Sequence, residues 1–338
     1  MSLRTEHHTI APETPPYLIA EIGLNHNGDL STAKRMVDAA KQSGAHAAKF
    51  QLFRSDLFIN KLARLGDGPP GSLSDFFRNF ELTEEQWALL RDHTRAARLD
   101  FMCSVFDSWS VSFYRDLGER VYKIASCDVN NGPLISSVLA DPAAALLIST
   151  GTASEEEIGR VAEWCASHEF ALLQCVSAYP ASPSDYHLNV LPAWSKRYAC
   201  PVGISDHCDG NEVSLAAVAL GACVIERHFT LDRNMEGPDQ ALSLDPPRFA
   251  ALAGGARRVF DALGENRRQP VEAEMGARKF GRRSLYAAQD IKAGQALTPA
   301  LDVAQRPGGA GVDVERYSEL IGIKAPRSYV SGEPIVAD

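Results

Sequence analysis

Short apolar runs that favour β-strands alternate with helix-favouring stretches along most of the chain, and this rhythm constrains the fold more than any other feature. The runs recur at intervals of roughly 20 to 30 residues, the spacing of βα units in a parallel sheet. We predict strands at residues 17–23, 46–53, 100–106, 120–126, 144–150, 170–177, 201–207 and 223–230. Eight parallel strands favour a closed (β/α)8 barrel over an open sheet.

The stretches between these runs carry helix signals. Thr83 with Gln86, and Ser154 with Glu157, have the spacing of capping boxes, in which side chains satisfy free amides at a helix start. We predict helices at residues 30–43, 84–99, 108–117, 134–140, 155–168, 184–196, 212–220 and 247–263. The connection 54–82 is too long for an ordinary barrel loop, so we interpret it either as a lid or interface arm or as a simple insertion.

The length of the chain predicts a second domain. The chain has 338 residues, whereas a barrel of this kind takes about 250. We predict a barrel domain at 1–265, a linker at 266–280 and a compact, mostly β module at 281–338, where turn-rich pieces separate short strands.

Composition excludes several classes of protein. The net charge of −9 argues against a general nucleic-acid surface, which needs a basic face. No apolar run approaches the roughly 20 residues of a membrane span, and the polar amino terminus lacks a signal-peptide core, so we expect a cytoplasmic protein. The seven cysteines are scattered without a C-x-x-C pair, which argues against a disulfide framework and a structural zinc site.

Two lysines stand in otherwise apolar predicted strands. Active sites of (β/α)8 barrels lie at the carboxyl ends of the strands, and a buried charge needs a partner or a ligand. Lys49 and Lys123 therefore predict a cationic lumen, and the hydroxyls and amides around Ser126, Ser149 and Gly151 would suit a phosphate beside a carboxylate. The alternative is that both lysines form structural ion pairs with carboxylates of the barrel.

His207 and His228 end two neighbouring predicted strands and form a candidate metal half-site. Two imidazoles with carboxylate and water ligands suit a borderline divalent ion such as manganese or iron, and Glu21 or Asp206 could complete or orient the set. The alternative is that the histidines are packing residues; His26 and His46 are weaker candidates.

Glu21 closes the first predicted strand and is a candidate general base, with an ion pair to Lys49 as the alternative. The chain has no G-x-S-x-G, no P-loop and no G-x-G-x-x-G after a strand. Serine hydrolase, nucleotide kinase and dinucleotide oxidoreductase functions therefore lose support.

Taken together, these motifs resemble the sialic acid (N-acetylneuraminate) synthase family, including spore coat polysaccharide biosynthesis proteins E. The resemblance runs from about residue 17 to the end of the chain, and its motifs keep their order. It rests on the segments at 20–28, 48–51, 101–106, 122–126, 149–151, 205–207, 226–230 and 237–239. Residues 282–285 and the segment after them are similar to the antifreeze-like (SAF) domain of these enzymes.

The resemblance implies a transferase that condenses phosphoenolpyruvate with an N-acyl aminosugar of the N-acetylmannosamine type, giving a nonulosonic acid and phosphate by C–O cleavage. It implies Glu21 as the catalytic residue, and His207 and His228 as ligands of a divalent metal, manganese before magnesium or cobalt. It also implies a domain-swapped homodimer in surface polysaccharide synthesis. The ligand-binding residues that it implies are Lys49, Ser104, Lys123, Ser126 and Ser149 for phosphoenolpyruvate, and Gln51, Tyr179, Asp239 and, from the other subunit, Arg306 for the sugar.

The chain departs from the family pattern at the sugar end. Ser177 stands where many members have asparagine, the stretch between Thr230 and Gly237 is short, and the 54–82 connection differs. One alternative therefore keeps the chemistry but changes the acceptor, as in a legionaminic-type or pseudaminic-type synthase. A non-catalytic sugar-phosphate-binding protein and a Schiff-base aldolase are further alternatives.

Overall fold

The computed structural model describes residues 2–297, 301–303, 311–320 and 322–336, which form two compact units, 1–264 and 265–338. Unit 1 is a closed barrel of eight parallel strands in the order β10-β3-β4-β5-β6-β7-β8-β9, so the predicted (β/α)8 fold is confirmed. The strands are β3 (Tyr17–Gly23), β4 (Ala47–Leu52), β5 (Asp100–Val105), β6 (Val121–Ile124), β7 (Ala145–Ser149), β8 (Glu169–Cys175), β9 (Val202–Ser205) and β10 (Val224–His228).

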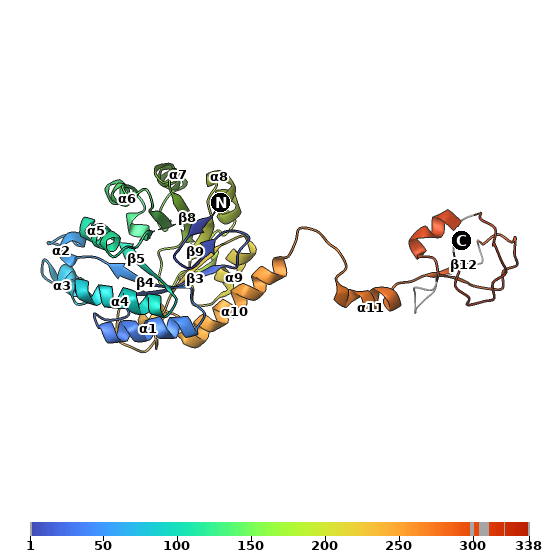
Figure 1. The fold of residues 1–338 in the computed structure, drawn as a ribbon, viewed down its shortest axis with the longest axis horizontal. Coiled ribbons are helices and arrows are strands. Elements are labelled where there is room, and N and C mark those ends of the chain that lie inside the picture. Colours follow the sequence, from blue (N-terminus) through green and yellow to red (C-terminus); the bar gives the residue numbers. More distant parts are fainter. Residues whose placement is uncertain (1, 298–300, 304–310, 321, 337–338) are drawn as a thin grey trace. The chain divides into compact units, whose positions relative to one another are not determined.

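Helices surround the barrel and cover the outward-facing side chains of the strands (Figure 1). They are α1 (Leu30–Gln42), α4 (Glu84–Ala96), α5 (Ser108–Asp116), α6 (Gly132–Leu139), α7 (Glu155–Trp164), α8 (Val190–Tyr198), α9 (Glu212–Ala219) and α10 (Pro246–Leu263). Both predicted capping boxes are present, at the starts of α4 and α7. The helix expected at 184–196 begins later, at Val190, after the short 3-10 helix Pro183–Asp185.

A short amino-terminal hairpin, which we did not predict, packs on the barrel. Its strands β1 (Leu3–Arg4) and β2 (Thr9–Ile10) pair antiparallel. Leu3 and Ile10 are fully buried in one cluster with Ile19, Met102 and other apolar side chains of the strands. Apolar contact with residues far along the chain therefore orders this otherwise polar segment.

The 54–82 connection is folded and contains two short helices, α2 (Ser55–Phe58) and α3 (Ser72–Arg78). Phe53 and Phe80 at its two ends are buried in one cluster with Leu24, and further phenylalanines pack against them. The segment is thus held on the barrel by aromatic packing.

Unit 2 contains helix α11 (Glu272–Gly281), the antiparallel pair β11 (Leu285–Ala287) and β12 (Leu301–Val303), and the 3-10 helix Val314–Leu320. Isolated bridges such as Ile291 with Tyr329 extend the β structure around a small apolar core. The linker expected at 266–280 includes most of α11. In the described part of the chain, no helix is both long and apolar enough to cross a membrane.

Candidate active site

A cavity of about 710 Å³ opens at the carboxyl ends of the barrel strands. This volume is typical of a small-molecule site. Of the residues that the family resemblance implies, all but one line it: Glu21, Lys49, Gln51, Ser104, Lys123, Ser126, Ser149, Tyr179, His207, His228 and Asp239. The exception, Arg306, lies outside the described residues.

Strand register brings these side chains together. Glu21 of β3 is paired with Lys49 of β4 on one side and with His228 of β10 on the other. Ser104 of β5 is paired in the same way with Gln51 and with Lys123. Paired residues of neighbouring parallel strands point to the same face, so all of these side chains point into the lumen.

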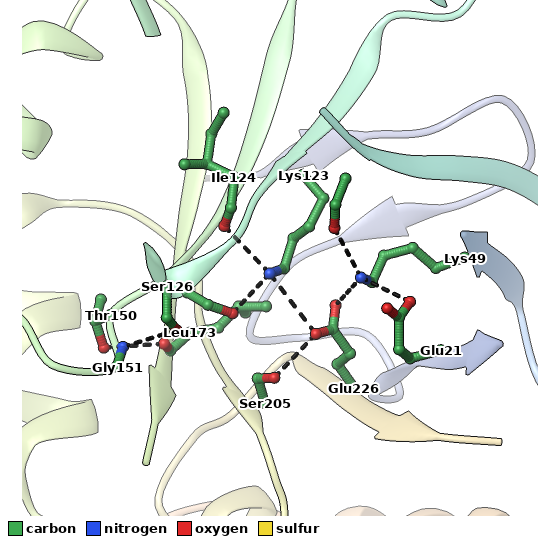
Figure 2. A network of polar contacts seen from close by, with 12 residues as sticks. Glu21, Lys49, Lys123, Ile124, Ser126, Thr150, Gly151, Leu173, Ser205 and Glu226 are labelled. Atoms are coloured by element: carbon green, nitrogen blue, oxygen red, sulfur yellow. Dashed lines mark hydrogen bonds and ion pairs between the residues drawn. The ribbon is translucent and has the colours of Figure 1, made fainter. Parts of the chain in front are cut away.

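Two lysines and two carboxylates form a buried network at the floor of the cavity (Figure 2). Lys49 Nζ lies 2.7 Å from Glu21 Oε2 and 3.5 Å from Glu226 Oε2, and Lys123 Nζ lies 3.6 Å from Glu226 Oε1. All four side chains are at most 6% exposed. The formal charges balance in this structure, so an incoming anion must compete with the carboxylates for both ammonium groups.

Burial and charge shift these groups in different directions. Burial raises the pKa of Glu21, and the charge of Glu226 adds to that effect, although Lys49 opposes both. Burial also acts to raise the pKa of Glu226, but Lys123, Lys49 and the Ser205 hydroxyl outweigh it and hold the pKa below its usual range. Of the two carboxylates, Glu21 is therefore the one that takes up a proton more readily.

Hydroxyls and one amide surround the two ammonium groups. Lys49 Nζ donates to Ser104 Oγ at 3.0 Å, and Lys123 Nζ donates to Ser149 Oγ at 2.7 Å. The amide of Gly151 donates to Ser126 Oγ at 3.0 Å, and a Cβ at position 151 would collide with that hydroxyl. Small polar groups beside two cations suit the oxygens of a phosphate and a carboxylate.

The two imidazoles lie beside this network on adjacent strands. The ring centroids of His207 and His228 are 5.5 Å apart. His207 Nδ1 donates to the carbonyl of Val176 at 2.8 Å, and the imidazole also forms a hydrogen bond with the side chain of Cys175, which lines the same cavity. His228 Nδ1 is buried without a hydrogen-bond partner and lies 3.8 Å from Asp239 Oδ2.

This arrangement fits two ligands of a divalent metal. The pKa of His228 is lowered by burial and by the nearby His207, so the imidazole is neutral and can donate a lone pair. Within the described ranges, no group of three or more His, Cys, Asp or Glu side chains is arranged to hold an ion.

The residues predicted to bind the sugar line the same cavity. Gln51 Nε2 donates to Glu21 Oε1 at 3.3 Å. The ring of Tyr179 is 4.3 Å from that of His207, and Tyr179 remains 54% exposed. Burial raises the pKa of Asp239. Ser177, which stands where many family members have asparagine, also lines the cavity.

Asp206, one of two carboxylates that could complete or orient the metal ligands, does not line the cavity, whereas Glu21 does. Its carboxylate accepts hydrogen bonds from Arg227 at 2.9 Å and from Ser214 at 2.5 Å, both buried. Side chains alternate along a strand and its extension, so Ser205 and His207 face the lumen while Asp206 faces the helices. His26 and His46 also lie away from the cavity.

Sequence reasoning gave no role to Glu226 or to the phenylalanines of the 54–82 connection, which we call the arm from here on. Glu226 lies two positions before His228, and strand alternation places both in the lumen, which is the signal that identifies it. Phe58, Phe76 and Phe77 also line the cavity. Their positions depend on how the 54–82 connection folds.

Comparison with known proteins identifies the family. Residues 36–268 match the NeuB family and residues 282–338 match the SAF domain. Since the first match covers more than half of the chain, the chain belongs to the NeuB family, which comprises sialic and related nonulosonic acid synthases.

Named relatives and solved structures support this assignment. The N,N'-diacetyllegionaminic acid synthase of Legionella pneumophila is 33% identical over 333 residues, which cover 95% of this chain and 93% of that protein. The N-acetylneuraminate-9-phosphate synthase of Homo sapiens is 33% identical over 325 residues, which cover 93% and 90%. The N-acetylneuraminic acid synthetase structure from Leptospira borgpetersenii has a TM-score of 0.74 at 32% identity, covering 82% of this chain and 94% of that one. Because the relatives are synthases, the chain is assigned as an enzyme.

Proposed function

We propose that the chain condenses phosphoenolpyruvate with an N-acyl aminosugar to give a nonulosonic acid and inorganic phosphate. The observation that carries this proposal is the pair of buried lysines, each hydrogen-bonded to a serine hydroxyl, in one cavity with Glu21 and two imidazoles. Phosphoenolpyruvate brings a phosphate and a carboxylate a few bonds apart, and two adjacent cations match that spacing of charge.

The reaction balances without an oxidant or reductant. C3 of phosphoenolpyruvate forms a bond to the aldehyde carbon of the open-chain sugar, whose oxygen takes up a proton, and C2 becomes an oxocarbenium ion. Water adds to C2 and loses one proton, which leaves a hydroxyl group on C2. The C2–O bond to phosphate then breaks as this hydroxyl forms the carbonyl and passes its proton to the phosphate. The products are a 2-oxo acid and inorganic phosphate.

The residues of the chain divide this work among themselves. Lys49 and Lys123 neutralise the charge on phosphate and carboxylate, and Ser104, Ser126 and Ser149 orient the oxygens. Glu21 accepts the proton of the attacking water and stabilises the cation at C2.

Glu226 balances both lysines while no anion is bound, and it keeps them positioned for one. His207 and His228 would hold a divalent metal, with manganese as the first candidate and magnesium or cobalt as alternatives. Such an ion, when bound, supplies a Lewis acid that polarises the aldehyde.

The direct test is to incubate the protein with phosphoenolpyruvate, manganese and a panel of N-acyl aminosugars. We expect release of one phosphate per condensed product, whose mass equals the acceptor plus the three-carbon 2-oxo acid unit. A protein that binds phosphoenolpyruvate but releases no phosphate with any acceptor would be a binding protein, and the proposal would fail.

A Schiff-base aldolase is distinguished by a separate experiment. Burial lowers the pKa of Lys123, which is the direction expected of a Schiff-base lysine. Borohydride would then reduce a pyruvate adduct onto the protein and increase its mass. Our proposal expects no such adduct.

We also propose a homodimer in which Arg306 of each chain completes the sugar end of the other. Mixing Glu21→Gln protein with Arg306→Ala protein under exchange conditions tests this arrangement. Because one mixed site would regain both residues, we expect partial recovery of activity, whereas an Arg306 acting within its own chain would give none.

A further inference from the structure

Four phenylalanines form one side of the cavity. Phe58 on α2, Phe76 and Phe77 on α3 and Phe106 after β5 line the same cavity as the two lysines, and we call these four residues the aromatic wall. The rings of Phe58 and Phe77 meet edge to face with centroids 5.4 Å apart, and Phe58 and Phe106 are 4.8 Å apart.

Packing from behind holds the aromatic wall in place. Phe53 is only 4% exposed, and its ring lies 5.4 Å from that of Phe58 and 5.7 Å from that of Phe77. Phe80, 8% exposed, supports Phe76 at 5.2 Å. Rings held from several sides present a fixed surface to the cavity.

Anchoring of the arm does not account for the wall. Phe53 and Phe80 already bury the two ends of the arm, whereas the four wall rings are only half-buried. Apolar surface that faces water in a cavity is unfavourable, and covering it with an apolar ligand group releases that free energy. The aromatic wall therefore favours a ligand with an apolar side.

Among the described residues that line the cavity, those on the wall side carry no charge for a phosphorylated ligand. The cations among the described lining residues are the floor lysines, with the two imidazoles beside them. Arg54 of the arm stacks over Trp109 at 3.9 Å and lies 3.4 Å from Glu81, and Arg78 pairs with Asp75 at 2.6 Å. A phosphate against the aromatic wall would lose water without gaining a partner.

We propose that the aromatic wall determines acceptor specificity: it selects an unphosphorylated N-acyl aminosugar whose end remote from the aldehyde carries a methyl in place of a hydroxymethyl group. This inference rests on the proposed function, which places the reacting aldehyde at the polar floor. The proposal places the remote end of the sugar against the aromatic wall, on the 54–82 side of the cavity.

Two matched pairs of acceptors test the proposal with the full-length chain. They are N-acetylmannosamine with its 6-deoxy analogue, and 2,4-diacetamido-2,4-dideoxymannose with its 6-deoxy analogue; N-acetylmannosamine 6-phosphate is the fifth acceptor. In whichever pair reacts faster, we expect kcat/KM to be about 10- to 100-fold higher for the 6-deoxy sugar than for its hydroxylated partner. N-acetylmannosamine 6-phosphate should be the poorest of the five acceptors.

Variants assign the preference to the aromatic wall. In Phe77→Ser or Phe58→Ser protein, the ratio of kcat/KM for the 6-deoxy acceptor to kcat/KM for its hydroxylated partner should fall to about threefold or less. The cause should be a higher KM for the 6-deoxy acceptor, while the KM for phosphoenolpyruvate stays unchanged. The matched control is Phe113→Ser, because Phe113 is a half-buried ring that stacks on Trp109 away from the cavity. This control should keep the wild-type preference.

The outcomes separate this inference from the proposed function. Phosphate release with equal or reversed preference in the wild type, or a preference that survives both wall substitutions, overturns the specificity role and leaves the condensation standing. Absence of phosphate release from every acceptor overturns the proposed function, and this inference falls with it.

Discussion

Lys49 Nζ lies 2.7 Å from Glu21 Oε2 in a pair whose side chains are 3% and 4% exposed. Glu21 and Lys49 are paired residues of neighbouring strands, so the contact follows from the register of the barrel. The ion pair expected as a structural alternative is thus present, and it lies inside the candidate site. One contact can therefore balance two buried charges and position the proposed base.

Replacing Glu21 by Gln should abolish most turnover while leaving phosphoenolpyruvate bound. The amide keeps the shape of the carboxylate but cannot accept the proton of water, so we expect kcat to fall by about 10²- to 10⁴-fold. Rapid-quench assays and calorimetric titration with phosphoenolpyruvate measure the two effects. Glu85→Gln, on the exposed face of α4, is the control. An unimpaired Glu21→Gln enzyme would refute the role of this residue.

Replacing Lys123 by Gln should act mainly on the anion. Its ammonium group bonds Ser149 and balances Glu226, so its loss leaves a buried carboxylate with one cation fewer. We expect the KM for phosphoenolpyruvate to rise by about 10- to 100-fold, corresponding to roughly 1.4 to 2.7 kcal/mol of lost interaction. The exposed Lys61→Gln variant should leave that KM unchanged. Unaltered affinity in Lys123→Gln protein would remove Lys123 from the anion site.

Replacing His207 or His228 by Ala should weaken manganese binding. Each change removes one of the two proposed protein ligands. Loss of a residue that only hydrogen-bonds to a metal ligand typically lowers metal affinity by roughly 10- to 100-fold, so we expect manganese affinity to fall by at least that factor. Electron paramagnetic resonance of free Mn²⁺ measures binding without relying on activity. His93→Gln, in which the lost imidazole contacts Asp38 on the barrel exterior, is the control. Wild-type manganese affinity in both variants would place the metal elsewhere.

His26 should make the fold sensitive to acid. The imidazole is fully buried, its Nδ1 accepts the amide of Gly28 at 3.1 Å, and burial lowers its pKa to about 4. In the unfolded chain the pKa is about 6.5, so the unfolded chain takes up the proton first as the pH falls. The contribution of His26 is present above pH ~6.5 and decreases as the pH falls to about 4, by at most about 3 kcal/mol.

Urea unfolding at several pH values measures this effect. His26→Gln protein should lose less stability between pH 6.5 and 4 than the wild type, even if it is less stable at neutral pH. The exposed His7→Gln variant should keep the wild-type pH dependence. Equal pH dependence in His26→Gln and wild-type protein would show that His26 does not contribute.

The barrel and much of its site were predictable because both follow from local pattern and topology. Eight apolar runs define eight strands, and a closed parallel barrel brings their carboxyl ends together. Polar residues at those ends, such as Lys49, Lys123 and His207, must then lie close together at one end of the barrel. Strand alternation also decides between the two carboxylates offered for the metal set, because it places Asp206 and His207 on opposite faces.

Other features depend on contacts that no local pattern specifies. Leu3 and Ile10 belong to a polar segment and become ordered only by packing on the barrel. The phenylalanines of the 54–82 connection are evident in the sequence, but two short helices and the turns between them decide which rings face the cavity. The balance among Glu21, Glu226 and the lysines likewise depends on distances across the lumen.

The fate of oxygen from water tests the central claim most directly. The reaction should be run with phosphoenolpyruvate and the best acceptor in ¹⁸O-labelled water, and the released phosphate should be analysed by mass spectrometry at early times. Attack of water at C2 with C–O cleavage predicts phosphate that carries no label from water. Phosphate with one ¹⁸O atom would mean that water attacks phosphorus, and it would contradict the mechanism proposed for this cavity.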